Sequence, residues 1–202
     1  MRKVDPVKHE KKRREIIEAA RVCFLRSGFQ GASISEICAE ARISPGHLYH
    51  YFASKEAIIG AQIEQALEDA AARFAPMMAS TNPVEALVSE IERVGTSTRI
   101  GGQTIVLDAL AEAVRNPTIA VAMQKHSKEV SAQLADVLRK AQHNGQGDRN
   151  LDADVAAAII ISIMDGMKTL AIRNPGLDTA KARDALKLLF GRFLSPAGTA
   201  EK

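Results

Sequence analysis

The helical organisation of this chain is clearest in residues 28–56, which read GFQGASISEICAEARISPGHLYHYFASKE. Ser33 stands three residues before Glu36, and this spacing is typical of a capping box, in which each side chain satisfies a free backbone N–H at a helix start. Ser44 and Pro45 predict a second start, because serine suits the N-cap and proline the first helical position. The stretch therefore contains two short helices separated by a tight turn.

Longer helices are expected on both sides of this pair. Apolar residues recur at three- and four-residue steps over residues 9–26, which end at Ser27-Gly28, and over residues 54–74, where Pro76 is expected to end the helix. The two short helices cannot form the core of a bundle alone. They fit a helix-turn-helix, in which the second helix is presented to a groove and the neighbouring helices supply buried support.

The rest of the chain also has helical periodicity. Clusters of Asn, Pro and Gly separate segments predicted to be helices at residues 83–97, 102–114, 118–143, 153–172 and 179–194. No useful strand pattern occurs. We predict an all-α fold of about nine helices. We expect residues 1–60 to form a three-helix helix-turn-helix domain and residues 61–202 to form a separate helical-bundle domain.

Composition sets broad limits on function. Of the 202 residues, 46% are hydrophobic and 25% charged, which excludes a mostly disordered chain. The sequence contains no run of about 18 uncharged apolar residues, which is the length needed to span a bilayer. No apolar run follows the charged N-terminus, so a secretory signal is not expected. Cys23 and Cys38 are too few for a disulfide framework or a four-ligand zinc site, so we expect small core residues in a reduced, cytoplasmic chain.

Positive charge is concentrated at the start of the chain. Residues 1–60 hold 11 Lys and Arg against 7 Asp and Glu, whereas residues 61–202 hold 16 against 17. The second short helix also carries four large side chains with polar tips: His47, Tyr49, His50 and Tyr51. We expect Leu48 and Phe52 to face inward and His47, His50 and Tyr51 outward. Such side chains can donate to phosphates or pack on base edges, with Gly46 leaving room for close approach.

These residues together are similar to a known family. Residues 28–56, preceded by Ile16, Ala20 and Phe24, resemble the DNA-binding domain of TetR-family transcriptional regulators over about residues 9–60. The resemblance implies a homodimer with a helix-turn-helix in each subunit and a C-terminal domain that binds a small effector. Arg42 departs from the pattern, because the family commonly has glycine there, and a positive φ would cost a non-glycine residue some energy.

The second half resembles the BetI-type subgroup of the family more loosely. The resemblance is carried by residues 112–117, the loop near Gly147 and residues 165–167.

The expected DNA contacts lie on the basic arm, the first short helix, the turn, the second short helix and the start of the long helix that follows: Lys12, Arg13, Ser33, Ile34, Arg42, Ser44, Pro45, Gly46, His47, Tyr49, His50, Tyr51 and Lys55.

The effector domain that the resemblance implies has its own candidate residues. Its cavity is expected to involve Phe74, Met77, Met78, Asp108, Met123, His126, Asp165 and Met167, although the methionines also suit an ordinary core. Asp165 contacts the effector or forms a structural pair with Lys168 or the dimer mate, and His126 fits a surface or satisfied core histidine better than a ligand group. The expected dimer interface involves Ile159, Ile163, Leu186, Leu189, Phe190 and Phe193.

Three functions remain as hypotheses. The first is a dimeric regulator, most often a repressor in this family, that binds a double-stranded operator and is released by a small molecule, without a cofactor, metal or membrane. The second is an all-α enzyme using His47, His50, His126 and Asp165, but no nucleophile elbow or phosphate-binding glycine loop accompanies them. The third is a pure dimerisation protein or a ligand carrier that has lost DNA binding, against which Tyr49, Lys55 and the basic arm argue.

Overall fold

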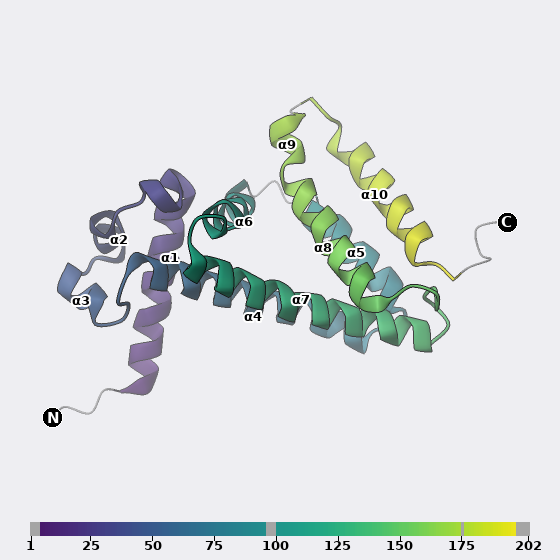
Figure 1. The fold of residues 1–202 in the computed structure, drawn as a ribbon, viewed down its shortest axis with the longest axis horizontal. Coiled ribbons are helices and arrows are strands. Elements are labelled where there is room, and N and C mark those ends of the chain that lie inside the picture. Colours follow the sequence, from purple (N-terminus) through teal and green to yellow (C-terminus); the bar gives the residue numbers. More distant parts are fainter. Residues whose placement is uncertain (1–4, 96–99, 175, 197–202) are drawn as a thin grey trace. The chain divides into compact units, whose positions relative to one another are not determined.

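The computed structural model describes residues 5–95, 100–174 and 176–196, and within these ranges the chain is helical with connecting loops and no strand (Figure 1). The all-α prediction is confirmed. The helices are α1 (Pro6–Gly31), α2 (Ile34–Ala41), α3 (Pro45–Tyr49), α4 (Lys55–Ala79), α5 (Pro83–Gly95), α6 (Ile100–Ala113), α7 (Pro117–His143), α8 (Ala153–Lys168), α9 (Leu170–Arg173) and α10 (Thr179–Leu194).

One predicted helix is divided in the structure. The segment expected at residues 153–172 is interrupted at Thr169, which separates α8 from the four-residue α9. This division gives ten helices in the described ranges where about nine were predicted. No described helix is both long and apolar enough to cross a membrane.

The chain packs as two compact units. Unit 1 consists of the described residues up to Ala66 together with Ile100–His126, and unit 2 of those within 67–99 and from Ser127 onward. Helices α4 and α7 each contribute to both units. By packing, α6 therefore belongs with the helix-turn-helix, whereas the functional boundary at residue 60 stays a prediction.

The core of unit 1 is formed by the apolar stripe of α1. Ile16, Ala20 and Phe24 are fully buried, and Leu48 and Phe52 pack into the same core, as their spacing predicted. Helix α1 does not stop at Gly28 but is kinked there, with φ 70° and ψ 172°, before the helix resumes to Gly31.

This kink is where α6 packs against α1. The Asp108 Oδ2 atom of α6 lies 3.2 Å from the position that a Cβ on Gly28 would occupy. One turn further along α6, the buried Glu112 carboxylate accepts a hydrogen bond of 2.7 Å from Gln30 Nε2. Glycine at position 28 thus permits both the unusual backbone conformation and the close approach of α6.

The cysteines are part of the unit 1 core. Cys23 and Cys38 are free and buried, and desolvation raises the pKa of both thiols. Both therefore serve as small core residues, as expected.

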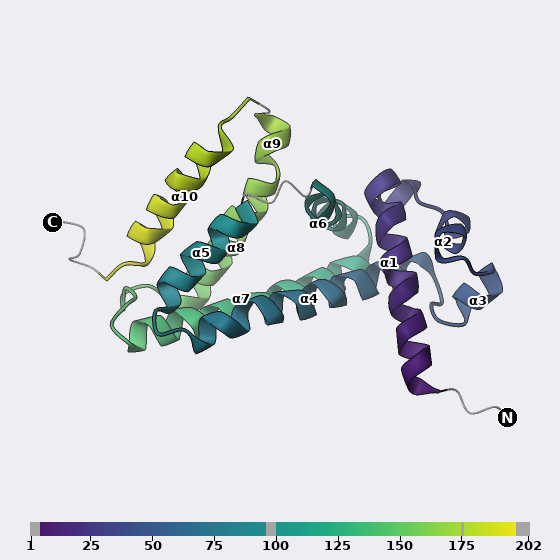
Figure 2. The ribbon, with the colours of Figure 1, turned by 180° about the vertical axis from the view of Figure 1, so that it is seen from behind.

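Unit 2 is built around α5, which lies against both α8 and α10 (Figure 2). Helix α4 continues through Pro76 to Ala79, so the expected stop at Pro76 is wrong. Two features hold this last turn in place: Met77 is buried in the unit 2 core, and Lys140 Nζ of α7 donates to the carbonyl oxygens of Met78 and Ser80. Packing and these bonds offset the backbone bond that proline cannot donate.

Candidate nucleic-acid interface

Helix α2 begins with the predicted capping box. Ser33 Oγ accepts from the Glu36 N–H at 3.2 Å, and the Glu36 carboxylate accepts from the Ser33 N–H at 2.7 Å. The backbone N–H of Ser33, followed by its hydroxyl, lowers the pKa of Glu36. These bonds fix the start of the helix locally, without help from distant residues.

The turn after α2 depends on Arg42. This residue has φ 53° and ψ 49°, the left-handed conformation, and it ends α2 while the Ile43 N–H donates to the Cys38 carbonyl at 3.0 Å. Ser44 Oγ then caps α3 by accepting from the His47 N–H at 3.2 Å. Helix α3 has only five residues and is anchored by the buried Leu48.

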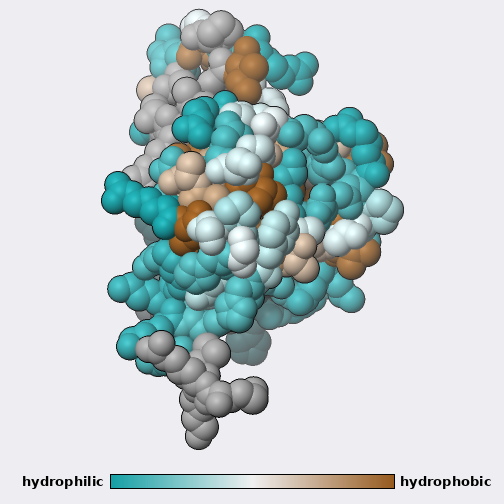
Figure 3. Space-filling view, turned by 90° about the vertical axis from the view of Figure 1, so that its left-hand side faces the viewer, coloured by the Kyte–Doolittle hydropathy of each residue, from teal (hydrophilic) through white to brown (hydrophobic). Residues whose placement is uncertain are grey.

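Most of the expected contact residues around this turn are exposed. Tyr49 is 53% exposed, and the space around Gly46 is open. The other exposed members of the set are Ser33, Arg42, Ser44, Pro45, His47 and His50. Figure 3 shows that the face viewed there is mainly hydrophilic. The half-buried members are Lys12, Arg13, Ile34, Tyr51 and Lys55.

Tyr51 corrects one expectation. It was predicted to point outward, but it is half-buried and packs against the unit 1 core. Its ring also contacts His9 of α1, with ring centroids 4.6 Å apart. Sequence reasoning missed His9 because helical periodicity pairs residues only within one element.

Three expected DNA-contacting cations have partners within unit 1. Lys55 Nζ donates to the carbonyl of Ala32 at 3.2 Å, which ties the start of α4 to the end of α1. Lys12 pairs with Glu15 at 2.9 Å. Arg13 lies 3.5 Å from the Glu64 carboxylate, and its guanidinium sits 5.3 Å from the centre of the Phe52 ring. These contacts position the three cations along the surface of α1 and α4.

The expected effector residues are divided between the two units. Asp108, Met123 and His126 belong to unit 1, and Phe74, Met77, Met78, Asp165 and Met167 belong to unit 2. Met77 is buried, Met78 is 41% exposed, and Asp165 is half-buried. The side chain of Lys168, one partner expected for Asp165, lies outside the described residues.

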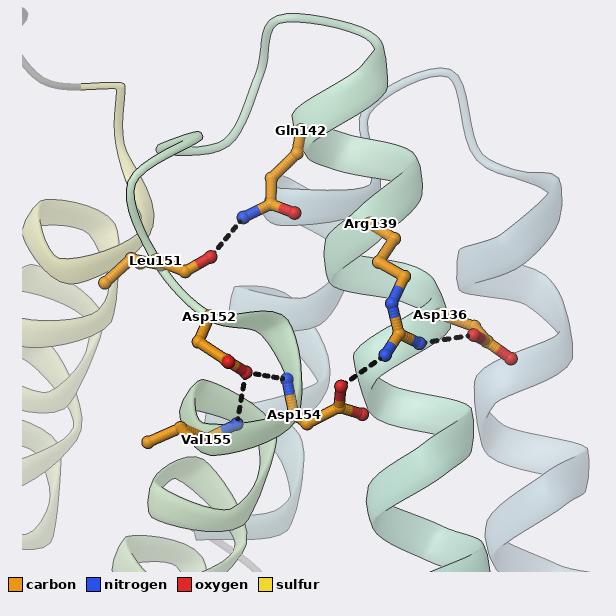
Figure 4. Close-up of polar contacts among 7 residues, drawn as sticks. All are labelled: Asp136, Arg139, Gln142, Leu151, Asp152, Asp154 and Val155. Atoms are coloured by element: carbon orange, nitrogen blue, oxygen red, sulfur yellow. Dashed lines mark hydrogen bonds and ion pairs between the residues drawn. The ribbon is translucent and has the colours of Figure 1, made fainter.

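A small cavity in unit 2 lies beside the α7–α8 connection. Its volume of about 10 Å³ has room for a single water molecule, and its lining includes Val84, Leu138 and Leu151 but none of the expected effector residues. The connection itself is well held (Figure 4): Gln142 Nε2 donates to the Leu151 carbonyl at 2.8 Å, and Arg139 bridges carboxylates of α7 and α8. This cavity is too small for an organic effector.

The expected dimer residues fall into three groups. Ile159 and Leu189 are 43% and 50% exposed, and Ile163 and Phe193 are half-buried. Leu186 and Phe190 are buried in the core of unit 2, so their part in a dimer interface stays a prediction. Sequence reasoning missed two exposed apolar residues on the same helices, Val155 at 56% and Leu188 at 54%. Among the described residues, no group of three His, Cys, Asp or Glu side chains could hold a metal ion.

Comparison with known proteins identifies the class to which this fold and surface belong. Residues 16–61 match the model for bacterial regulatory proteins of the tetR family, and residues 102–194 match the C-terminal model of BetI-type transcriptional repressors. The transcriptional regulator UidR of Escherichia coli strain K12 is 33% identical over 155 residues, which cover 77% of this chain and 79% of that protein. The chain therefore belongs to the TetR family of helix-turn-helix transcriptional regulators.

Other relatives and solved structures agree. The transcriptional repressor AcnR of Corynebacterium glutamicum is 24% identical over 179 residues, covering 89% of this chain and 90% of that protein. Salmonella enterica GusR has a TM-score of 0.78 at 28% identity and covers 91% of this chain and 95% of its own. A regulator from Saccharomonospora viridis in complex with choline has a TM-score of 0.78 at 22% identity, covering 92% and 98%, and shows the shared fold.

Proposed function

We propose that this protein is a dimeric, ligand-responsive repressor whose α3 surface reads an operator in the major groove. The observation that supports this most directly is the exposure of His47, Tyr49 and His50 on a helix fixed from beneath by Leu48. Side chains presented in this way can donate to phosphates and base edges without unfolding their support. The remaining contacts are proposed at the other expected residues, with Lys12, Arg13 and Lys55 near the backbone of the duplex.

Dimerisation is proposed through the exposed apolar residues of α8 and α10. Two copies of α3 must enter successive major grooves about 34 Å apart, so a single chain would read only one half-site. Covering Ile159 and Leu189 with a second copy of the chain is favourable, because it removes exposed apolar surface from water.

Release is proposed to follow effector binding in the region of Asp165 and Met167. In a second conformation of the dimer, the distance between the two α3 helices no longer fits successive major grooves. An effector that binds this conformation more tightly than the DNA-binding one lowers operator affinity by the ratio of its two affinities. The protein is expected to act on DNA in the cytoplasm. We propose no catalytic activity, because the chain belongs to a family of transcriptional regulators.

A binding titration tests this proposal. Fluorescent duplexes from the region upstream of its own gene are titrated with protein at several salt concentrations, beside a scrambled duplex. We expect sequence-selective binding that weakens steeply with salt. His47→Ala should reduce affinity about tenfold, as expected for the loss of one specific contact. His143→Ala, which removes an exposed histidine of unit 2, is the matched control and should not. Equal binding to both duplexes would contradict the proposal.

A further inference from the structure

Four aromatic rings meet on the surface of unit 1, and we call them the ring cluster: His9, His47, His50 and Tyr51. The Tyr51 ring is central, with centroids at 4.6 Å from His9, 5.4 Å from His50 and 5.5 Å from His47. His9 also meets His50 edge to face at 6.1 Å. Residues from the first turn of α1 and from α3 and its C-terminal end are thus brought into one contiguous group.

Tyr51 gives this group a fixed position. Its ring is half-buried and packs against the unit 1 core, whereas His47 and His50 are exposed and His9 is half-buried. The three imidazoles are therefore arranged around a supported ring, with His47 and His50 exposed and His9 half-buried. An imidazole offers one N–H donor when neutral and two when protonated.

The charged groups next to the ring cluster have other partners. One turn from His9 on α1, the Asp5 carboxylate caps the helix by accepting from Val7 N, and Lys12 and Arg13 pair with Glu15 and Glu64.

Charged groups of α4 also have partners within unit 1. From α4, Lys55 donates to carbonyls at the end of α1 and Glu64 faces Arg13, and Tyr49 is the remaining titratable side chain of α3. Among the ion pairs of the described residues, none includes an imidazole of the ring cluster. A bound phosphate would supply the negative charge that protonated imidazoles need as a partner.

We infer that His9, His47 and His50 form a single phosphate-binding surface for duplex DNA, and that the imidazoles take up protons when DNA binds. This inference rests on the proposed function and adds α1 to the contact surface through a residue outside the expected set. A phosphodiester stabilises the protonated form, so binding and protonation favour each other. Operator affinity should therefore be highest at low pH and fall as pH rises, because an imidazole loses its second proton as pH rises.

The size of the effect depends on the number of protons taken up. By linkage, each proton bound with the DNA changes affinity by at most about tenfold per pH unit. Three imidazoles close together also repel one another when charged. The logarithm of operator affinity should therefore fall by less than three units per pH unit, unless several phosphates are contacted.

The experiment measures operator affinity at fixed ionic strength from pH 5.5 to 8.5 for the full-length protein. The wild type should weaken as pH rises. His9→Gln, which keeps a hydrogen-bonding side chain but does not titrate, should reduce the slope, and the triple variant with His47→Gln and His50→Gln should nearly abolish it. His143→Gln in unit 2 is the matched control and should keep the full slope.

Different failures have different meanings. If the wild type does not select the operator at any pH, the proposed function fails. If it binds but its affinity is independent of pH, or if His9→Gln keeps the full slope, the inference is wrong. Proton uptake by the wild type is also counted by calorimetry in two buffers of different ionisation enthalpy, which does not depend on how any variant folds. A count of zero would overturn the inference, and a positive count is expected.

Discussion

The surface of α3 and the surfaces of α8 and α10 both leave large side chains in water, but the side chains differ in kind. On α3 the exposed residues are His47, Tyr49 and His50, which carry hydrogen-bonding groups. On α8 and α10 they include Ile159 and Leu189, which carry none. Polar rings can exchange water for phosphates and bases, whereas aliphatic side chains gain mainly from being covered by other apolar groups. The comparison separates a surface suited to DNA from one suited to a second copy of the chain.

The largest expected effect comes from replacing an exposed apolar side chain of α10 with a charged one. Leu189→Asp places a charge on the apolar surface, and burying that charge between two copies is strongly unfavourable. We expect the dissociation constant of the dimer to increase by at least about 100-fold, which corresponds to a loss of about 3 kcal/mol in the free energy of association. Sedimentation velocity should show the mass of one chain at micromolar concentration, with loss of operator binding.

A substitution on the same helix provides the control. Ala180 is exposed and nine residues from Leu189, which is half a turn out of phase. Ala180→Glu should leave both mass and DNA binding unchanged. A Leu189→Asp protein that remains dimeric would show that α10 does not form the interface.

The next effect tests the support of the α3 surface in unit 1. Gly28 has a φ and ψ combination that is essentially restricted to glycine, and Asp108 Oδ2 lies only 3.2 Å from the position of a Cβ there, a tight contact. Gly28→Ala should therefore lower the free energy of unfolding by about 2–3 kcal/mol. Gly46→Ala, where the space is open, should not lower it but should weaken DNA binding if a phosphate or base approaches closely. Chemical denaturation measures the free energy of unfolding of both variants. Equal stability of the two would contradict the assigned role of Gly28.

A smaller effect is expected at the turn. Arg42 is the one non-glycine residue of the described chain with positive φ, so Arg42→Gly should raise the free energy of unfolding by about 1 kcal/mol. The same change removes a cation and should weaken DNA binding most at low salt. Arg42→Asn separates the two effects, because asparagine tolerates the left-handed conformation but is uncharged. If Arg42→Gly is less stable than the wild type, the turn is not strained.

The smallest effect is a pH dependence at the start of α2. The pKa of Glu36 is lowered in the folded state, so its capping bonds contribute stability above the unfolded pKa and lose it as pH falls through the folded value. Glu36→Gln should be less stable than the wild type at pH 7, and the difference should shrink as pH falls below the ordinary glutamate value of 4.5. Glu40→Gln, on the same helix but outside the box, is the control. A difference that is constant from pH 7 to pH 3 would contradict this assignment.

The sequence was most informative where structure is determined locally. The capping box of Ser33 and Glu36, the cap at Ser44 and the inward positions of Leu48 and Phe52 were all predicted and are confirmed. Each depends on residues within a few positions of one another, for which spacing is a sufficient guide.

Features that depend on distant residues were not predicted. Tyr51 is half-buried, and His9 contacts it from 42 positions earlier in the chain, so no local pattern could reveal their contact. Lys55 donates a hydrogen bond to a carbonyl at the end of α1. Pro76 is tolerated within α4 because Lys140 of α7 donates to carbonyl oxygens at the end of that helix. Periodicity placed Phe190 on an apolar face but could not distinguish the core of its own unit from a surface.

The most direct test of the central claim is the stoichiometry and spacing dependence of operator binding. Half-sites one helical turn apart are compared with the same half-sites separated by about 5 additional base pairs, which turns one to the opposite face of the duplex. We predict two chains per duplex, bound cooperatively and selectively to the first arrangement, with loss of this binding in the second. Equal binding to both arrangements, or one chain per duplex at saturation, would contradict the claim that two α3 helices read one face of DNA.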